Sequence, residues 1–395
     1  MAALTVCAAL SPGPAGAAQL VGTDVPSCRP PAVDAAFVVV PVNAGRAFTA
    51  NPCLAAQAAG LRQVQLFVNG ADPGPGATHW PGGGCASAHT PSCAQLYGEA
   101  VATDAIATVR ASGAQLLPRI WWVDIETLNT WTGTHAANLA SIRGTVQALR
   151  SRPDLVSAVG IYSSRQQWHD ITGDDRSMTV PQWSGTPMAT QAQAEDNCSS
   201  TASFTQGPVV MTQFARPDGA DGDVVCPPRL GSHAPARSGE SLLVQGSALP
   251  GSVVTVESHE PDRTIRRQHV TTPSSGTWQA RVRLRFTGTI QLATAAGLRR
   301  GIVAVAPALP LSVSTGRCVV SASGTVTPHY PGQQVQVVVS GGRSATVGTG
   351  ATGFWHARVP QPCGALVSVQ ARITGVDGRT RWVSAARSRS VIVRV

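Results

Sequence analysis

Short apolar runs recur through the first half of the chain, separated by polar or Gly/Pro-rich stretches. They are continuous rather than strictly alternating, which is typical of strands buried on both faces of a parallel sheet. Helical periodicity appears at 94–112, with Thr90 or Ser92 as candidate N-caps, at 135–150 after Thr134, and over a shorter span at 164–171. Strands are predicted at 19–24, 35–43, 63–69, 114–126, 155–163, 179–183, 208–214 and 221–225. Eight strands with an incomplete set of helices predict an α/β fold, an irregular (β/α) TIM-like barrel with its chemistry at the carboxyl ends of the strands.

The pattern changes after residue 232, where helical periodicity stops and Val, Thr, Ser and Gly alternate. An internal repeat is present: SSGTWQARVRL (274–284) matches ATGFWHARVPQ (351–361), and residues 244–256 match 321–339. Two repeats of short strands predict two all-β Ig-like sandwich modules, at 233–310 and 311–395, after a barrel at 19–232. The shared Trp278 and Trp355 are interpreted as core residues rather than ligand platforms.

Charge divides the chain in the same place. All 30 basic residues are Arg, and the sequence contains no Lys. Residues 1–232 carry 12 Arg and 16 Asp or Glu, whereas residues 233–395 carry 18 Arg and 5 Asp or Glu. Arg281, Arg283 and Arg285 alternate on one strand face, to which Arg266–Arg267 and Arg299–Arg300 are candidates to add. Two interpretations stay open for this stripe, a solvated face or a docking surface for anionic cell-envelope polymers.

The cysteines and the first residues predict export. Residues 1–18 resemble the end of a secretory signal peptide, although a positive n-region is missing. Without Cys7 in that segment, eight Cys remain, which allow 105 connectivities. Pairing nearest neighbours gives 28–53, 85–93, 198–226 and 318–363; the alternative is eight buried free thiols. No apolar run reaches the about 18 residues of a membrane-spanning helix, and no Cys or His spacing matches a zinc site.

The segment IWWVDIET (120–127) places two carboxylates in an apolar run. In a strand, Trp122, Asp124 and Glu126 share one face, and Trp121, Val123 and Ile125 share the other. Buried carboxylates are costly unless they are paired or line a wet site, and close carboxylates raise each other's pKa. That arrangement can supply a protonated acid beside an ionised partner, as glycoside cleavage requires. The alternative is a structural pair capped by an arginine, such as Arg119 or Arg143.

VDIET, with the strand before it and the helix after it, resembles the D-x-E strand of glycoside hydrolase family 25, the lysozyme-type N-acetylmuramidases. Further likenesses follow in the family's order: GTDVPSC (22–28), VGIYSSRQQW (159–168), PQW (181–183), MTQF (211–214) and DGADGDVV (218–225). The segment NAGRAFTANPCL (43–54) is similar to secreted actinobacterial relatives, and the Arg- and Ala-rich composition is typical of high-GC bacteria. The resemblance covers residues 19–228.

This resemblance implies roles for particular residues. Glu126 matches the general acid, Asp124 the partner that stabilises developing charge or orients an acetamido group, and Asp24 the first-strand acid of the same mouth. The family's last aspartate aligns with Val225, so Asp221 or Asp223 is the candidate replacement in a shifted register. Substrate-binding candidates are Tyr162, Trp183, Gln213, Asp221, Asp223, Asn69 and Asn43, the last two because each ends a predicted strand.

The remaining sequence motifs say less about function. The Gly/Pro-rich stretch 66–85 lacks the G-K-[ST] of a phosphate loop and is predicted to form the groove rim, with His79 and His89 as surface residues. Ser163–Ser164 have no His/Asp pair placed by motif, which argues against a serine hydrolase. Sparse aromatic residues and the cysteines argue against a nucleic-acid partner.

The sequence therefore predicts a secreted, monomeric hydrolase without metal or organic cofactor, which cleaves β-1,4 glycosidic bonds of cell-wall peptidoglycan. The rival predictions are a catalytically inactive protein that binds envelope glycans and a structural surface protein.

Overall fold

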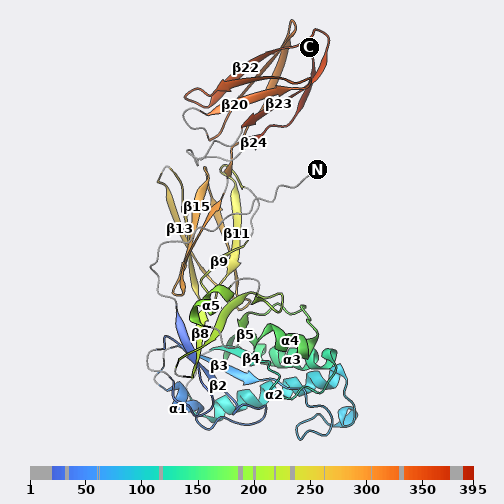
Figure 1. Ribbon diagram of the computed structural model, residues 1–395, viewed down its shortest axis with the longest axis vertical. Coiled ribbons are helices and arrows are strands. Elements are labelled where there is room, and N and C mark those ends of the chain that lie inside the picture. The colour runs from blue at the N-terminus through green and yellow to red at the C-terminus, as the bar shows by residue number, and fades with distance from the viewer. Residues whose placement is uncertain are drawn as a thin grey trace.

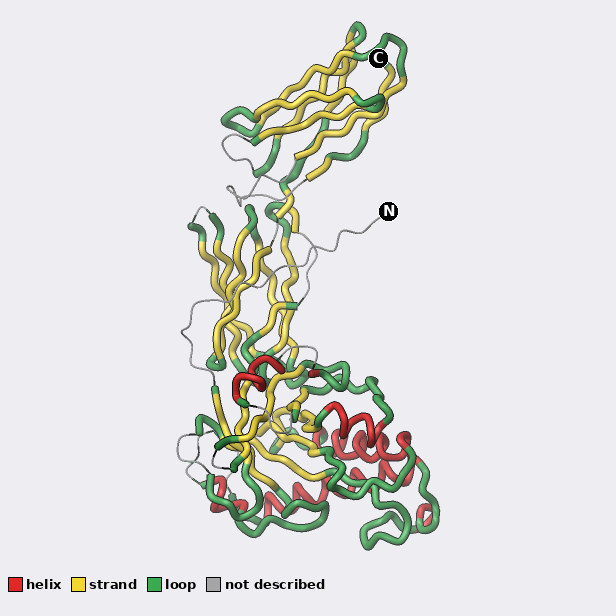
Figure 2. Tube along the Cα trace, in the orientation of Figure 1, coloured by secondary structure: helices red, strands yellow, loops and turns green. Residues whose placement is uncertain are grey.

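The computed structural model describes residues 20–31, 35–59, 61, 63–114, 119–185, 190–198, 202–217, 219–231, 236–261, 263–303, 305–328, 333–373 and 386–395. The predicted leader at 1–18 lies outside the described residues. A helix-bearing barrel is followed by two units made of strands, which Figures 1 and 2 show in a row. None of the described helices is both long enough and apolar enough to cross a membrane.

Eight strands close the barrel in chain order; six lie within the segments predicted for them, and β6 and β7 each extend one residue beyond theirs. They are β1 (Val21–Asp24), β2 (Val38–Pro41), β3 (Val64–Asn69), β4 (Arg119–Asp124), β5 (Val156–Ser163), β6 (Gln182–Ser184), β7 (Val209–Ala215) and β8 (Asp221–Val225). Neighbours from β1 to β7 are parallel, whereas β8 is antiparallel to both β7 and β1. A regular (β/α)8 barrel has eight parallel strands, so the last strand departs from that pattern.

Helices follow β2 to β6 and cover the outside of the barrel. They are α1 (Leu54–Ala58), α2 (Pro91–Ala111), α3 (His135–Arg150), α4 (Arg165–Thr172) and α5 (Gln191–Asn197), with a 3-10 turn at Gly83–Cys85. The side chains of Thr90, Thr134 and Ser164 cap α2, α3 and α4, because each accepts a backbone N–H of the first turn. The predicted helices therefore form, whereas α1 and α5 were not predicted.

Strand β4 is buried on both faces, as its continuous apolar run predicts. Trp121, Val123 and Ile125 pack in the cluster that includes α2 and α3, whereas Trp122 packs inside the barrel against Trp183. The alternation places Asp124 on the inner face. The IWWVDIET segment thus contributes to both layers of the core, and its Asp124 carboxylate lies inside the barrel.

The chain beyond the barrel forms two units of paired sheets. The first contains the sheets β14-β11-β9 and β13-β12-β15-β16, with β10 paired to β17; the second contains β18-β19-β22 and a sheet of β21, β20, β23, β24 and β25. Their bounds are β9 (Arg229–Leu230), β10 (Ala236–Arg237), β11 (Ser241–Ser247), β12 (Val253–His259), β13 (Ile265–Thr271), β14 (Thr277–Arg283), β15 (Gly288–Thr294), β16 (Gly297–Val303), β17 (Val305–Ala306), β18 (Ser312–Gly316), β19 (Val319–Thr325), β20 (Gln334–Val339), β21 (Arg343–Gly348), β22 (Phe354–Pro360), β23 (Leu366–Ile373), β24 (Ala386–Arg387) and β25 (Val391–Arg394).

The repeated tryptophans occupy equivalent core positions. Trp278 is paired in register with Gly246, and Trp355 with Gly324, and both indoles are buried. A Cβ at Gly246 would lie 2.6 Å from Trp278, and one at Gly324 would lie 2.9 Å from Trp355. Each ring therefore lies over a glycine of the neighbouring strand, which confirms the interpretation as core residues.

The arginines of the predicted stripe are divided between two sheets of the first all-β unit. Arg281 and Arg283 are exposed on β14 of the first sheet. Arg267 and Arg300 belong to β13 and β16 of the other sheet, where Arg267 pairs with Glu257 at 2.6 Å. The two sheets touch at this edge, where Gln268 of β13 donates to the carbonyl oxygen of Arg281 on β14 at 3.0 Å, and the docking stripe stays a prediction.

All four nearest-neighbour disulfides form, namely Cys28–Cys53, Cys85–Cys93, Cys198–Cys226 and Cys318–Cys363. The alternative of eight free thiols is therefore wrong. Three of the bonds lie in the barrel, where each ties a loop or helix end to a neighbouring segment.

The first all-β unit packs against the barrel at the amino-terminal end of the strands. Ala296, in the turn between β15 and β16, is buried in the cluster that holds Val210 and the interior of the barrel, and Leu249 packs against the same cluster. A Cβ at Gly276 would lie 3.1 Å from Pro208, just before β7. This contact closes the end of the barrel opposite to the carboxyl ends of β1 to β7.

Candidate functional site

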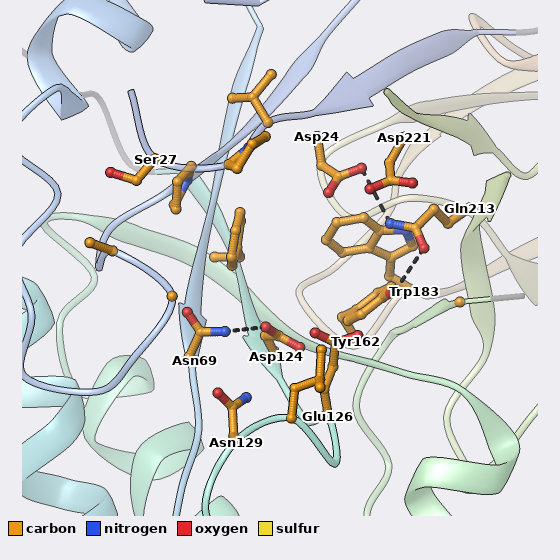
Figure 3. Close-up of a pocket in the computed structure, with 18 of the residues that line it drawn as sticks. Asp24, Ser27, Asn69, Asp124, Glu126, Asn129, Tyr162, Trp183, Gln213 and Asp221 are labelled. Atoms are coloured by element: carbon orange, nitrogen blue, oxygen red, sulfur yellow. Dashed lines mark hydrogen bonds between the residues drawn. The ribbon is translucent and has the colours of Figure 1, made fainter. Parts of the chain in front are cut away.

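A cavity of about 700 Å³ lies at the barrel end where the parallel strands finish. Asp24 ends β1, Asn69 ends β3 and Asp124 ends β4. Because β8 runs the opposite way, its first residue, Asp221, lies at this end as well and pairs in register with Asp24. All four side chains line the cavity (Figure 3).

Four side chains form one level of the cavity wall. Asn69, Asp124, Tyr162 and Trp183 are in parallel register on successive strands, so they project to the same side. The Asn69 Nδ2 donates a hydrogen bond to Asp124 Oδ2. The rings of Tyr162 and Trp183 lie 4.4 Å apart between centroids. This level joins a carboxylate, an amide and two aromatic rings.

A hydrogen-bond chain crosses the mouth from β5 to β1. The Tyr162 hydroxyl donates to Gln213 Oε1 at 2.7 Å, and Gln213 Nε2 donates to Asp24 Oδ1 at 3.3 Å. Figure 3 shows both bonds, with Gln213 between Asp24 and Tyr162. The chain fixes the orientation of the Gln213 amide, so its nitrogen faces the carboxylate.

Glu126 lies on the rim, two residues beyond the end of β4. Its carbonyl oxygen accepts a hydrogen bond from Trp131 Nε1 at 2.8 Å, and the next amide, of Thr127, donates to Gln167 Oε1 at 3.0 Å. Glu126 is partly exposed, whereas Asp124 is 4% exposed. One carboxylate thus reaches the open cavity, and its neighbour is enclosed below it.

Burial makes these carboxylates hard to ionise. Burial, then the charge of Asp221, raises the pKa of Asp24 to about 7, against the opposing Gln213 hydrogen bond. Burial, then the charges of Glu126 and Asp24, raises the pKa of Asp124 well above its usual range. Burial also raises the pKa of Glu126; a hydrogen bond from Gln167 opposes this rise, and the charge of Asp221 adds to it. Carboxylates this close cannot all carry charge near neutral pH.

Strand β8 carries the two candidate replacements for the family's last aspartate, Asp221 and Asp223, and the aligned Val225. The three residues lie at different depths in the barrel. Asp221 lines the cavity, Asp223 is fully buried, and Val225 packs in the interior cluster with Trp122 and Trp183. Burial, then the charges of Asp24 and Asp221, raises the pKa of Asp223 well above its usual range. Asp221 is therefore the β8 acid that lines the cavity, and Asp223 lies deeper inside the barrel, between Asp221 and Val225 on the same strand face.

Several predicted positions lie elsewhere. Asn43 is 3% exposed, and its Oδ1 accepts a hydrogen bond from the Asn69 backbone N–H at 3.2 Å, so it braces the wall without lining it. Of the 66–85 stretch, only Phe67 and Asn69 line the cavity, so the predicted rim role of the glycine-rich part is wrong.

The two predicted surface histidines have partners. His89 Nε2 contacts Asp72 Oδ1 at 2.9 Å, and Asp72 is fully buried. His79 stacks on Phe48 at 4.0 Å between centroids. Sequence spacing missed the Asp72 contact because the two residues are 17 positions apart.

The arginines considered as caps lie away from the pair. Arg119 begins β4, at the opposite end of the barrel, and Arg143 donates to Ser177 and lies 3.9 Å from Asp175. The basic residue that lines the cavity is Arg29, whose charge lowers the pKa of Asp221 against the effect of burial.

Other lining residues were not predicted. They follow the ends of strands or begin α4, and they are Ser27, Arg29, Leu128, Asn129, Ser164 and Gln167. The rule that chemistry gathers beyond the carboxyl ends of barrel strands would have identified these segments, but not the side chains that point inward. Within the described ranges, no group of three His, Cys, Asp or Glu side chains is arranged to hold a metal ion.

Comparison with protein families gives a lysozyme-like class. The family model described as Lys-1, lysozyme-like protein 1, matches residues 90–206, less than half of the chain. The matched part runs from α2 past β6 and contains Asp124, Glu126, Tyr162 and Trp183; Asp24 and Gln213 lie outside it.

Comparison with individual proteins adds little. No curated protein matches the chain. Among solved structures, the spore cortex lytic enzyme SleM of Clostridium perfringens is 10% identical over 95% of this chain and 98% of that chain, with a TM-score of 0.35. A two-domain fibronectin type-III segment of chicken tenascin is 16% identical over 43% of this chain and 99% of that chain, with a TM-score of 0.29. At such TM-scores neither likeness bears on function.

Proposed function

We propose that the barrel is a TIM-like glycosidase that resembles glycoside hydrolase family 25. It hydrolyses peptidoglycan at the β-1,4 bond after N-acetylmuramic acid. The observation that carries this proposal is the placement of Glu126 on the rim of a cavity that the more deeply buried Asp124, two residues earlier, also lines. The lysozyme-like match over residues 90–206 supports it, because that part of the chain includes both carboxylates.

Glu126 acts as the general acid. A general acid must hold its proton near the working pH and must reach the leaving oxygen. Glu126 meets both needs, since burial raises its pKa and its side chain lines the open cavity. The hydrogen bond between Thr127 and Gln167 holds the turn that carries it.

Asp124 stabilises the positive charge that develops on the sugar. Asn69 fixes its orientation by donating to one carboxylate oxygen, and the other oxygen has no protein partner among the described residues. Asp124 can stabilise an oxocarbenium-like centre in its ionised form, which is favoured while its neighbours Glu126 and Asp24 keep their protons. Asp24 and Asp221 complete the acidic mouth, and Tyr162, Trp183 and Gln213 form the wall against which the sugar lies.

The protein acts outside the cell, where disulfides persist. Its four disulfides support this part of the proposal. The two C-terminal units are Ig-like modules, and the exposed Arg281 and Arg283 are the residues through which the first would contact anionic wall polymers.

The test is the release of reducing ends from purified peptidoglycan by the wild-type protein and by Glu126→Gln. We expect release by the wild type and a loss of at least 100-fold in the variant, in line with the usual contribution of general acid catalysis. The matched control is Glu240→Gln, which removes an exposed carboxylate from the first all-β unit. Equal release by the wild type and Glu126→Gln would refute the assignment. Sedimentation with the wall without any release would instead identify a glycan-binding protein.

A further inference from the structure

Arg29 is the single basic residue among the described residues that line the acidic cavity. It lies on the loop after β1, is exposed, and no ion pair or side-chain hydrogen bond to another described residue engages its guanidinium. The remaining charged lining residues are Asp24, Asp124, Glu126 and Asp221. The cavity thus has one positive side in an otherwise negative wall.

The loop that carries Arg29 is held by a disulfide and by two hydrogen bonds from a buried glutamine. The disulfide Cys28–Cys53 joins it to the start of α1. The Gln57 amide, which is 4% exposed, donates to the carbonyl oxygens of Pro26 at 2.9 Å and Arg29 at 2.7 Å. These contacts fix the backbone of Arg29, so binding requires ordering only its side chain.

Asn51 completes the support of the same loop. Its Nδ2 donates to Gln57 Oε1 at 2.7 Å, and its Oδ1 accepts from the Ser27 hydroxyl at 2.8 Å. Asn51 itself is 3% exposed. A buried amide network therefore holds an exposed arginine at the cavity, an arrangement that solvation of a surface charge does not require.

We propose that Arg29 binds a carboxylate of the substrate and so makes the cavity selective for glycans that carry an acidic group. This inference rests on the proposed function and names the substrate feature that the cavity recognises. A guanidinium binds a carboxylate through two parallel hydrogen bonds, whereas a neutral amino-sugar polymer offers it no charged partner.

The same arrangement sets the register of the glycan. The carboxylates of the wall repel an anionic group wherever they carry charge, so Arg29 is the one favourable position for it. Anchoring the acidic group at the β1 loop fixes which glycosidic oxygen lies beside Glu126. In peptidoglycan, the carboxylate comes either from the lactyl group of the sugar or from the attached peptide.

Binding by Glu126→Gln, which leaves the ligand uncut, separates recognition from turnover. Isothermal calorimetry would use three soluble ligands: neutral N-acetylglucosamine oligomers, peptide-free glycan fragments with a free lactyl carboxylate, and fragments whose lactyl group is amide-linked to peptide. The affinity for each ligand is measured with Glu126→Gln as the parent and with three double variants, in which Arg29→Gln, Arg29→Lys or the control Arg46→Gln is added to it. Arg46 is exposed on the neighbouring β2 loop and does not line the cavity.

We expect Arg29→Gln to weaken binding of a carboxylate ligand about tenfold and to leave the neutral oligomer unchanged, with Arg29→Lys between the two and Arg46→Gln without effect. The fragment that loses affinity identifies the lactyl group or the peptide as the source of the carboxylate. Salt should weaken this binding in the parent and have little effect in Arg29→Gln.

Unchanged affinity for both acidic fragments would overturn the proposal, and so would an equal loss for the neutral oligomer, which would mean that Arg29 only shapes the loop. A parent protein that binds neither acidic fragment would overturn it too. Failure of the proposed function is a separate result, in which these fragments bind but the wild type releases no reducing ends.

Discussion

The buried carboxylate of Asp24 should make the barrel less stable as the pH rises. Its folded-state pKa of about 7 lies above the value of 3.8 expected for an unfolded chain. The folded state therefore holds the proton more tightly than the unfolded state. The resulting stabilisation is fully present below pH 3.8 and is lost as the pH rises through 7.

The magnitude follows from the size of the shift. Each pKa unit corresponds to about 1.36 kcal/mol, so the full shift corresponds to about 4 kcal/mol. Because Asp24 borders the open cavity and keeps some contact with water, we expect about half of that, roughly 2 kcal/mol. For a domain of this size, 2 kcal/mol corresponds to about 4–8 °C in Tm.

The substitution Asp24→Asn removes the charge and keeps an oxygen that can accept the Gln213 hydrogen bond. We expect the variant to melt about 4–8 °C above the wild type at pH 8 and at nearly the same temperature at pH 4. Calorimetry across this range measures the difference, and Asp154→Asn, an exposed site at the other end of the barrel, is the control. A Tm difference that is the same at pH 4 and pH 8 would refute the reasoning.

Three further variants test single contacts of the cavity. Tyr162→Phe removes the hydroxyl that orients Gln213 and should lower kcat several-fold at a stability cost of about 1 kcal/mol, measured by reducing-end kinetics and thermal melts. Leu128→Ser should leave Tm unchanged, because Leu128 is 94% exposed, and should weaken glycan binding, because that side chain lines the cavity; unchanged affinity would contradict this role. Replacing Cys28 and Cys53 together by Ser should cost about 3 kcal/mol of unfolding free energy, since their bond closes a 25-residue separation; a denaturant titration checks this value.

The barrel strands could be predicted because burial on both faces leaves a continuous apolar run. The two missed helices lack such a signal. Helix α1 has five residues, too few for a period to show, and α5 buries only Ala194. The Thr190 to Gln193 capping box was the available sign of α5. The reversed β8 also had a sign, because five residues between Ala215 and Asp221 are too few for a parallel crossover.

The candidate site was predictable where a strand alternation or a family motif fixed the side chain. Asp124 is on the inner face because of the period of two in β4, and Asn69 lies beside it because both end neighbouring strands. Arg29 could not be found in this way. Its position depends on a loop closed by the disulfide and by Gln57, a residue 28 positions away, and no local pattern encodes that contact.

The reversed direction of β8 also decides where the chain leaves the barrel. Val225, at the carboxyl end of β8, pairs with Met211 and lies near the amino-terminal ends of the other strands, so the polypeptide exits on the side away from the cavity. Figure 1 shows the two all-β units following one another away from that end of the barrel. Had β8 been parallel, the downstream chain would have emerged at the mouth. The two all-β units instead lie at the end of the barrel away from the cavity, so under the proposed function they would leave a long polymer free to approach the mouth from the side.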